Sequence, residues 1–395
     1  SADMKRAGLI LFIMLAILWL PFPVMASMSP ASQESAALLE DTIDSLDLSE
    51  LETFKANIDD EIAAYTSHKN VKDWLLEFVS GEWEFNPRSI LSGIIHYFCD
   101  ELMANSGLLA KLIILSVLAA LLLNLQQSFS SDIGKVAYLA CFLAMGTIAI
   151  GTFKLVLGIG QHTIDNMSTF MLGMLPQMMV LVAGLGNING SVLLFPLLMT
   201  SATAFAAAIK NVVFPLIIIS AALHLVNGIS ETIKVERLAK FMGQLAQILL
   251  GFFLTFFVGM LTLRALYASA LDKVTLRTTR FVTDNAIPIV GKMVGDTIEV
   301  AAGYVVMLKQ ALGVWGVIVI LGIIIYPLLE IAVLALIYKI VGAVVEPMGD
   351  ARTASILEMM SAHLFLMMAA TAAVALMFFI MIAIVVGLYS GAAIR

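Results

Sequence analysis

Residues 311–345 read ALGVWGVIVILGIIIYPLLEIAVLALIYKIVGAVV, a stretch with two charged side chains, Glu330 and Lys339. An α-helix needs about 20 apolar residues to cross the hydrocarbon core of a bilayer, and this stretch is longer. Seven further apolar runs lie at about 107–125, 136–157, 168–186, 191–209, 212–228, 243–270 and 363–391. We therefore predict an all-α polytopic membrane protein with about 7–8 transmembrane helices.

The composition of the whole chain agrees with this class. Of its 395 residues, 61% are hydrophobic and 13% are charged, whereas soluble proteins are about 45–50% apolar and about 25% charged. The net charge of −7 gives no basic surface for nucleic acid. Two cysteines, Cys99 and Cys141, allow at most one disulfide and no cysteine-built metal site.

Residues 1–26 have the order of a secretory signal peptide. A basic start at 4–6 precedes an apolar stretch at 8–20, and small residues at 24–26 form a cleavage pattern. An uncleaved first membrane helix is the alternative. Both readings place the segment after Ala26 outside the cytoplasm.

The acidic segment 27–106 follows. Between Ser27 and Asn105 there are sixteen acidic and four basic residues, and apolar residues recur there at helical spacing. This segment is predicted to be helical and either to dock an extracytoplasmic partner or to be a solvated hairpin without one. Its last part, 89–103, is expected to be an interfacial helix leading into the first transmembrane pair, 107–164.

The basic loops do not follow one simple topology. If successive spans cross the membrane in alternate directions, starting from outside, the loops 126–135 and 229–242 lie inside the cell. The second of these loops is basic, as the positive-inside rule requires. The next basic segment, 272–292, then falls outside. We therefore expect 272–310 to be a re-entrant or amphipathic hairpin, since it is too polar to face lipid.

The second part of the chain contains an internal echo. Phe195-Pro196-Leu-Leu recurs as Tyr326-Pro327-Leu-Leu, and similar apolar runs follow both. If this is a duplication, 165–271 and 272–395 are two halves of one bundle, as in many transporters; a chance echo among few residue types is the alternative. The candidate helix breaks are its prolines: Pro176, Pro196, Pro215, Pro288, Pro327 and Pro347.

Charged residues inside a bilayer are functional candidates by default, because they are costly there. Arg264 and Glu330 lie well inside apolar runs and have opposite charges, so we predict that they pair or line a polar pathway or gate. A purely structural pair is the alternative. Lys210 lies near a run end and is expected to snorkel, and His224 is expected to pack between helices rather than bind a ligand.

The sequence indicates no enzyme. It contains no phosphate-binding loop, no Ser-His-Asp set and no HExxH motif. We expect no cofactor and no metal, so energy for any transport must come from another protein or from a gradient.

Several motifs are similar to those of the stage III sporulation protein AE family. Residues 107–112, 121–129, 164–171 and 234–240 carry part of the resemblance, and the 274–293 stretch VTLRTTRFVTDNAIPIVGKM carries most of it. The matching positions in that stretch include Thr275, Arg277, Arg280, Asp284, Asn285, Pro288 and Gly291. The resemblance runs from the signal peptide to the last span.

The resemblance implies a function in endospore formation. Proteins of this family lie in the mother-cell membrane surrounding the forespore, in an assembly with a cytoplasmic ATPase and ring-forming members. That assembly meets stage II sporulation protein Q, so Q is an indirect partner. The chain is then expected to be an export-gate-like channel component, and its copy number, including a homo-oligomer, stays open. The alternatives are a stand-alone secondary transporter of a small solute and a structural membrane platform.

Overall fold

The computed structural model describes residues 49, 51–52, 70–80, 87–129, 132–184, 188–229, 234–286 and 290–387. All regular structure in these residues is helical, which confirms the all-α class. The predicted signal peptide and most of the acidic segment lie outside the described residues.

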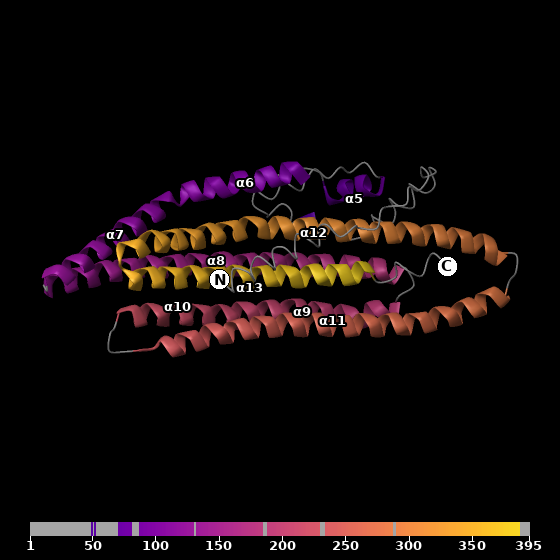
Figure 1. The fold of residues 1–395 in the computed structure, drawn as a ribbon. Coiled ribbons are helices and arrows are strands. Elements are labelled where there is room, and N and C mark those ends of the chain that lie inside the picture. The colour runs from indigo at the N-terminus through magenta and orange to yellow at the C-terminus, as the bar shows by residue number, and fades with distance from the viewer. Residues whose placement is uncertain are drawn as a thin grey trace.

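Long helices run side by side and alternate in direction along the chain (Figure 1). Connections of only a few residues join most of them, so long helices that follow one another are antiparallel neighbours in space, whereas the helical stretches within 87–129 and within 188–229 continue in one direction. The elements are α5 (Val71–Ser80), α6 (Pro87–Ala104), α7 (Ser106–Phe129), α8 (Asp132–Gly184), α9 (Ile188–Ala208), the π-helical turn η1 (Ile209–Val213), α10 (Phe214–Ile229), α11 (Glu236–Ala286), α12 (Val290–Val345), the 3-10 turn η2 (Glu346–Met348) and α13 (Ala351–Gly387).

Six helical segments of the described chain are long and apolar enough to cross a membrane. The eight apolar runs merge into these six because two pairs of runs share a helix. Runs 136–157 and 168–186 both belong to α8, and runs 191–209 and 212–228 belong to the continuous series α9, η1 and α10. The six candidate spans are Ser106–Leu125, Gly134–Gly184, Pro196–Gly228, Glu236–Leu263, Val305–Met348 and Ala351–Gly387.

Three of the candidate break prolines lie inside helices. α8 continues through Pro176, α9 through Pro196 and α12 through Pro327. Membrane helices tolerate proline because neighbouring helices and hydroxyl groups satisfy the backbone groups that it frees. At these positions the helix therefore continues where the sequence led us to expect a break.

The other prolines differ from one another. Pro215 is the second residue of α10, directly after η1, whereas Pro347 lies in η2, where α12 ends. Pro288 lies outside the described residues. The superposition of 165–271 on 272–395 stays a prediction, and Pro215 and Pro347 are not equivalent in their local structure.

α13 is the central helix of the bundle. It packs against α8, α10, α11 and α12, with the most extensive contact to α12, and 78% of its most apolar window is buried. Its middle, residues 369–375, is almost entirely alanine and threonine. Small residues let neighbouring backbones approach closely, which is how membrane helices gain packing energy.

Several helices are much longer than a bilayer is thick. α8, α11 and α12 have 53, 51 and 56 residues, which corresponds to about 80, 76 and 84 Å at about 1.5 Å per residue. The far ends of α11 and α12 extend past α8, α9 and α13 (Figure 1). The segment 272–310 therefore forms the end of α11 and the beginning of α12 on either side of 287–289.

Candidate functional site

Of the predicted pair of Arg264 and Glu330, the structure describes only the Glu330 side chain. Glu330 is half-buried in α12. Arg264 belongs to α11, but its side chain lies outside the described ones. Their pairing stays a prediction.

The family-motif positions fall on two helix ends. Thr275, Arg277, Arg280, Asp284 and Asn285 belong to the last part of α11, and Gly291 belongs to the first turn of α12. Their side chains, and Pro288 as a whole, lie outside the part of the chain that the structure describes.

A buried polar cluster joins three helices around α13. The Ser220 hydroxyl of α10 lies 2.7 Å from the Ala239 carbonyl oxygen of α11 and 2.8 Å from Nε2 of His363 in α13. Nδ1 of His363 lies 2.7 Å from the carbonyl oxygen of Met359, one turn earlier. Ser220 and His363 are buried, so this small network links α10, α11 and α13 inside the apolar bundle.

The cluster has two hydrogen-bond arrangements that differ by one proton. In neutral His363, Nδ1–H donates to Met359 O and Nε2 accepts from Ser220. In protonated His363, Nε2–H donates to Ser220 Oγ, and the Ser220 hydroxyl then donates to Ala239 O. The two distances to His363, 2.8 and 2.7 Å, suit both arrangements. The 2.7 Å between Ser220 Oγ and Ala239 O suits the second arrangement, in which a hydrogen lies between the two oxygens, so the first arrangement requires α11 to move slightly away. In the first arrangement Ser220 links α10 to α13 only. In the second it links α10 to both α13 and α11.

Two further residues complete this cluster. The His224 ring lies 5.3 Å from the His363 ring, centroid to centroid, in an edge-to-face arrangement. His224 Nδ1 is buried and has no hydrogen-bond partner among the described residues. A Cβ added at Gly243 would lie 3.0 Å from Ser220 Oγ. The glycine therefore allows α11 to pack closely against α10 at the cluster.

A second polar site connects α8 to α9–α10 near their middle. Lys210 Nζ of η1 lies 2.6 and 2.7 Å from the two carboxylate oxygens of Asp165. Its ammonium thus binds a carboxylate on the neighbouring helix, and the expectation that Lys210 snorkels stays a prediction. On α8, Asn166 Nδ2 lies 3.2 Å from His162 Nε2. π-helical turns such as η1 often mark functional positions in helices.

Side chains of α7 and α8 and a buried aspartate just before α13 hold the turn between α12 and α13. Asp350 is fully buried and caps α13, since its Oδ1 accepts from the Thr353 N–H at 3.0 Å. Tyr138 of α8 donates to the same carboxylate at 3.3 Å, and Asn124 of α7 donates to Met348 O at 3.1 Å. This turn is a structural hub for α7, α8, α12 and α13.

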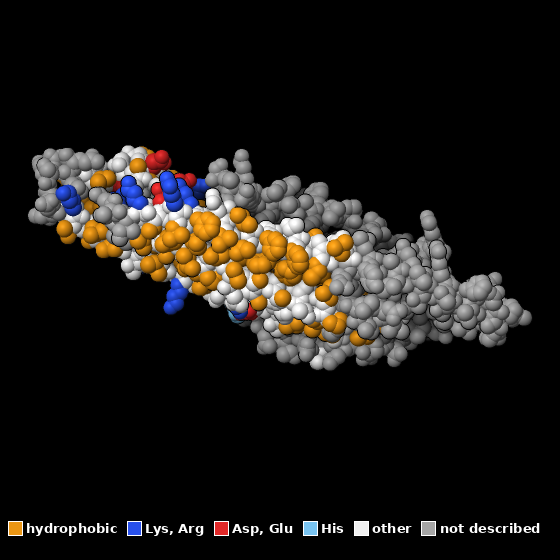
Figure 2. Space-filling view, turned by 90° about the horizontal axis from the view of Figure 1, so that it is seen from below, with side chains coloured by type: hydrophobic (Ala, Val, Ile, Leu, Met, Phe, Trp, Pro, Cys, Tyr) orange, Lys and Arg blue, Asp and Glu red, His pale blue; other side chains and the backbone are white. Residues whose placement is uncertain are grey.

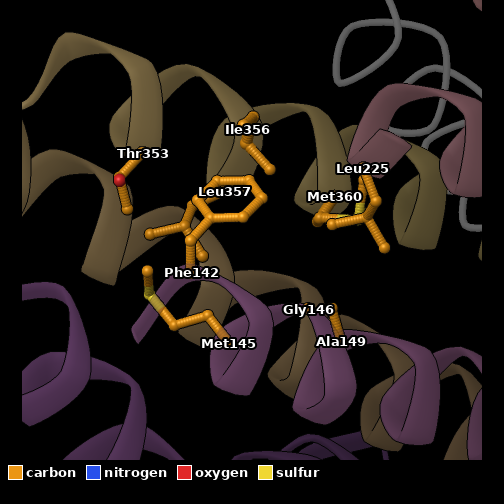
Figure 3. Close-up of a pocket in the computed structure, with 9 residues that line it drawn as sticks. All are labelled: Phe142, Met145, Gly146, Ala149, Leu225, Thr353, Ile356, Leu357 and Met360. Atoms are coloured by element: carbon orange, nitrogen blue, oxygen red, sulfur yellow. The ribbon is translucent and has the colours of Figure 1, made fainter. Parts of the chain in front are cut away.

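A cavity between α8, α10 and α13 is apolar and small. Figure 3 shows Phe142 and Met145 of α8 facing Leu357 and Met360 of α13, with Leu225 of α10 beside them. Its volume is about 10 Å³, which is about the space of one water molecule. This cavity is therefore a packing gap and not a solute pocket. Within the described chain, no three His, Cys, Asp or Glu side chains group as metal ligands would.

Sequence reasoning missed the Ser220–His363 link for a clear reason. The two residues are 143 positions apart, and neither belongs to a local motif. The available signal was the presence of histidine and serine inside apolar runs, which marks polar contacts between membrane helices.

These features define a polytopic helical membrane protein with polar links between its spans. Comparison with known proteins gives the family. The model of the stage III sporulation protein AE family matches residues 69–388. Stage III sporulation protein AE of Bacillus subtilis (strain 168) is 31% identical over 316 residues, which cover 80% of this chain and 79% of that protein. The chain belongs to the stage III sporulation protein AE family. No solved structure matches it.

Proposed function

We propose that this chain is a channel or gate component of the sporulation assembly that links mother cell and forespore. Its family gives it a role in sporulation. By the resemblance, its partners are other stage III sporulation proteins, including an ATPase and ring-forming members. It acts without chemistry of its own, in the mother-cell membrane around the forespore.

The distribution of basic residues supports an orientation in that membrane. The α7–α8, α10–α11 and α12–α13 connections lie at the same end of the bundle (Figure 1). Basic residues flank all three: Lys135, Lys234, Arg237, Lys240 and Arg352. Figure 2 shows Lys and Arg side chains gathered toward that end of a hydrophobic surface. By the positive-inside rule this end faces the cytoplasm, and the mature N-terminus lies outside.

The same orientation accounts for the basic segment 272–292. α11 is about 76 Å long, and the bilayer core is about 30 Å thick. With its first residues at the cytoplasmic surface, its last turns extend beyond the bilayer. Residues 272–286, the last part of α11, then project from the bilayer on the extracytoplasmic side, so their charges do not lie in hydrocarbon.

The observation that carries the gate is the buried Ser220–His363 cluster. A gate needs an element with two discrete arrangements whose balance a partner can shift. The Ser220 hydroxyl has two such arrangements, and they differ in whether α11 is tied to α10 and α13. A purely apolar interface would offer no comparable choice of partners.

The test uses His363→Gln in a spore-forming host. Glutamine has a similar size but cannot bind Met359 O and Ser220 as the imidazole does. The matched control is Thr371→Ala on the same helix, because the buried Thr371 hydroxyl bonds only to Met367 O of its own helix at 3.1 Å. We would measure membrane abundance, co-purification with other assembly members and heat-resistant spore yield.

Normal abundance and co-purification with a collapsed spore yield for His363→Gln, but not for Thr371→Ala, would support the gate. Normal spore yield for His363→Gln would refute it and favour a structural platform. Glu330→Gln tests the other predicted polar element in the same way. A stand-alone transporter would instead move a small solute when reconstituted without partners.

A further inference from the structure

One exposed face of the bundle differs in composition from the others. On α8, the exposed residues between Leu155 and Val180 are Gly158, His162, Asp165 and Thr169. Along Pro196–Asn211 the exposed residues with described side chains are Pro196, Thr200, Thr203, Ala204, Ala207 and Asn211. Both sets repeat at three- and four-residue spacing, so each forms one continuous stripe on its helix. We name these two stripes together the polar face.

Within these bounds the described residues of the polar face expose no large apolar side chain, and the exposed Leu155, Val180 and Val212 mark its margins. Large apolar side chains dominate the exposed surface of α7 and α11. α7 exposes Ile114, Leu118, Leu121 and Leu125, and α11 exposes Phe241, Ile248, Phe252, Phe256 and Leu263. Figure 2 shows such a hydrophobic surface seen from below. Leucine, isoleucine and phenylalanine are what a lipid-facing helix carries. The two kinds of surface therefore differ in composition, and each suits different surroundings.

The Asp165–Lys210 ion pair connects the two stripes. The Asp165 side chain is 55% exposed and the Lys210 side chain 28% exposed, so the charges are not sealed inside the bundle. The amide and ring of Asn166 and His162 add hydrogen-bonding groups beside them. An exposed carboxylate in hydrocarbon is strongly unfavourable even when it has a cationic partner on one side.

The ion pair also lies near the middle of a helix that is long and apolar enough to cross a membrane. Lys210 is near the middle of the candidate span Pro196–Gly228. At about 1.5 Å per residue, the apolar helix extends about 21 Å to one side of Lys210 and about 27 Å to the other. A hydrocarbon core about 30 Å thick therefore has the pair within it or at its edge.

We propose that the polar face lines a hydrated passage through the membrane. Water and polar solutes then contact its hydroxyl, amide and charged groups, while the apolar faces of α7 and α11 contact lipid. This inference rests on the proposed channel function and names the surface that carries it.

The test is cysteine accessibility in the full chain, in membranes from sporulating cells. The background carries Cys99→Ser and Cys141→Ala, which remove the two natural cysteines. Thr203→Cys tests the polar face, because the Thr203 hydroxyl bonds only within its own helix. Phe256→Cys is the control at similar depth, since its ring lies 6.0 Å from that of Phe205, two residues beyond Thr203.

Charged methanethiosulfonates react with thiolates, and thiolates form in water. We expect Thr203→Cys to be modified at least about tenfold faster than Phe256→Cys. Equal rates for both cysteines would overturn the proposal: if both are slow, lipid or another protein covers the polar face, and if both are fast, water reaches the two surfaces alike. Thr169→Cys, on the other stripe, provides a second site if Thr203→Cys is poorly expressed, with the same two outcomes.

The labelling result separates this proposal from the proposed function. No labelling of the polar face with a collapsed spore yield for His363→Gln would refute the hydrated face and leave the gate standing. Labelling of the polar face with normal spore yield for His363→Gln would support the hydrated face and refute the gate.

Discussion

Gly243→Ala should destabilise the bundle at the buried polar cluster. An alanine Cβ at this position would lie 3.0 Å from Ser220 Oγ, tighter than ordinary van der Waals contact. The hydroxyl cannot move aside easily, because it lies 2.7 Å from Ala239 O and 2.8 Å from His363 Nε2. The substitution therefore pushes α11 away or breaks a hydrogen bond.

The expected magnitude follows from two opposing terms. Replacing glycine by alanine inside a helix stabilises it by about 1 kcal/mol. Overpacking a rigid site costs about 1–3 kcal/mol. Gly251→Ala on the same helix isolates the first term, since a Cβ there meets nothing within 4 Å. Gly243→Ala should therefore be about 1–3 kcal/mol less stable than Gly251→Ala.

A double substitution makes the reasoning sharper. Ser220→Ala alone removes interhelical hydrogen bonds, which are worth about 0.6 kcal/mol each on average in membrane proteins. In the Gly243→Ala background it also removes the clashing oxygen, and the next atoms, Ser220 Cβ and His363 Nε2, are at 3.8 Å. Ser220→Ala should thus destabilise the wild type and stabilise Gly243→Ala.

The assay is thermal unfolding of the purified full chain in detergent, with all four variants measured under one condition. Gly243→Ala unfolding at the same temperature as Gly251→Ala would refute the steric argument. A failure of Ser220→Ala to raise the melting temperature of Gly243→Ala would show that the clash lies elsewhere.

Three further predictions concern the other polar sites, each measured by the same thermal assay. Asp165→Lys and Lys210→Asp should each lower the melting temperature, and the double reversal should recover most of the loss; additive losses would show that the pair is not coupled. Gly349 has φ = 89°, so Gly349→Ala should cost about 1–2 kcal/mol in the left-handed region, and an unchanged melting temperature would contradict this. Asp350→Ala should cost about 0.5–2 kcal/mol through loss of the α13 cap, with Asp350→Asn closer to wild type because it keeps an acceptor oxygen.

The helical class followed from the apolar runs, but the number of helices did not. Local composition shows where a chain is apolar and not where a helix ends. The stretch 158–167 contains His162 and Asp165, which suggested a boundary, yet α8 continues through it. The backbone needs no apolar side chains to stay helical, and Lys210 supplies the carboxylate's partner from another helix.

Contacts between distant segments were the part that sequence reasoning could not supply. Arg264 and Glu330 were paired by charge sign alone, and that pairing stays a prediction. Other links that the structure shows, such as Tyr338 of α12 donating to Thr152 of α8 at 2.9 Å, join uncharged hydroxyl groups, so charge sign gives no signal for them. Only the packing of the bundle brings such groups together.

The length of α12 gives the molecule a mechanical property. A helix of 56 residues is a rod about 84 Å long. Tilting such a rod by about 5° about one end displaces the other end by about 7 Å, more than one helical turn. In the orientation proposed above, a sideways force on the projecting ends of α11 and α12 would tilt the spans, and the partner that exerts it would not need to enter the membrane.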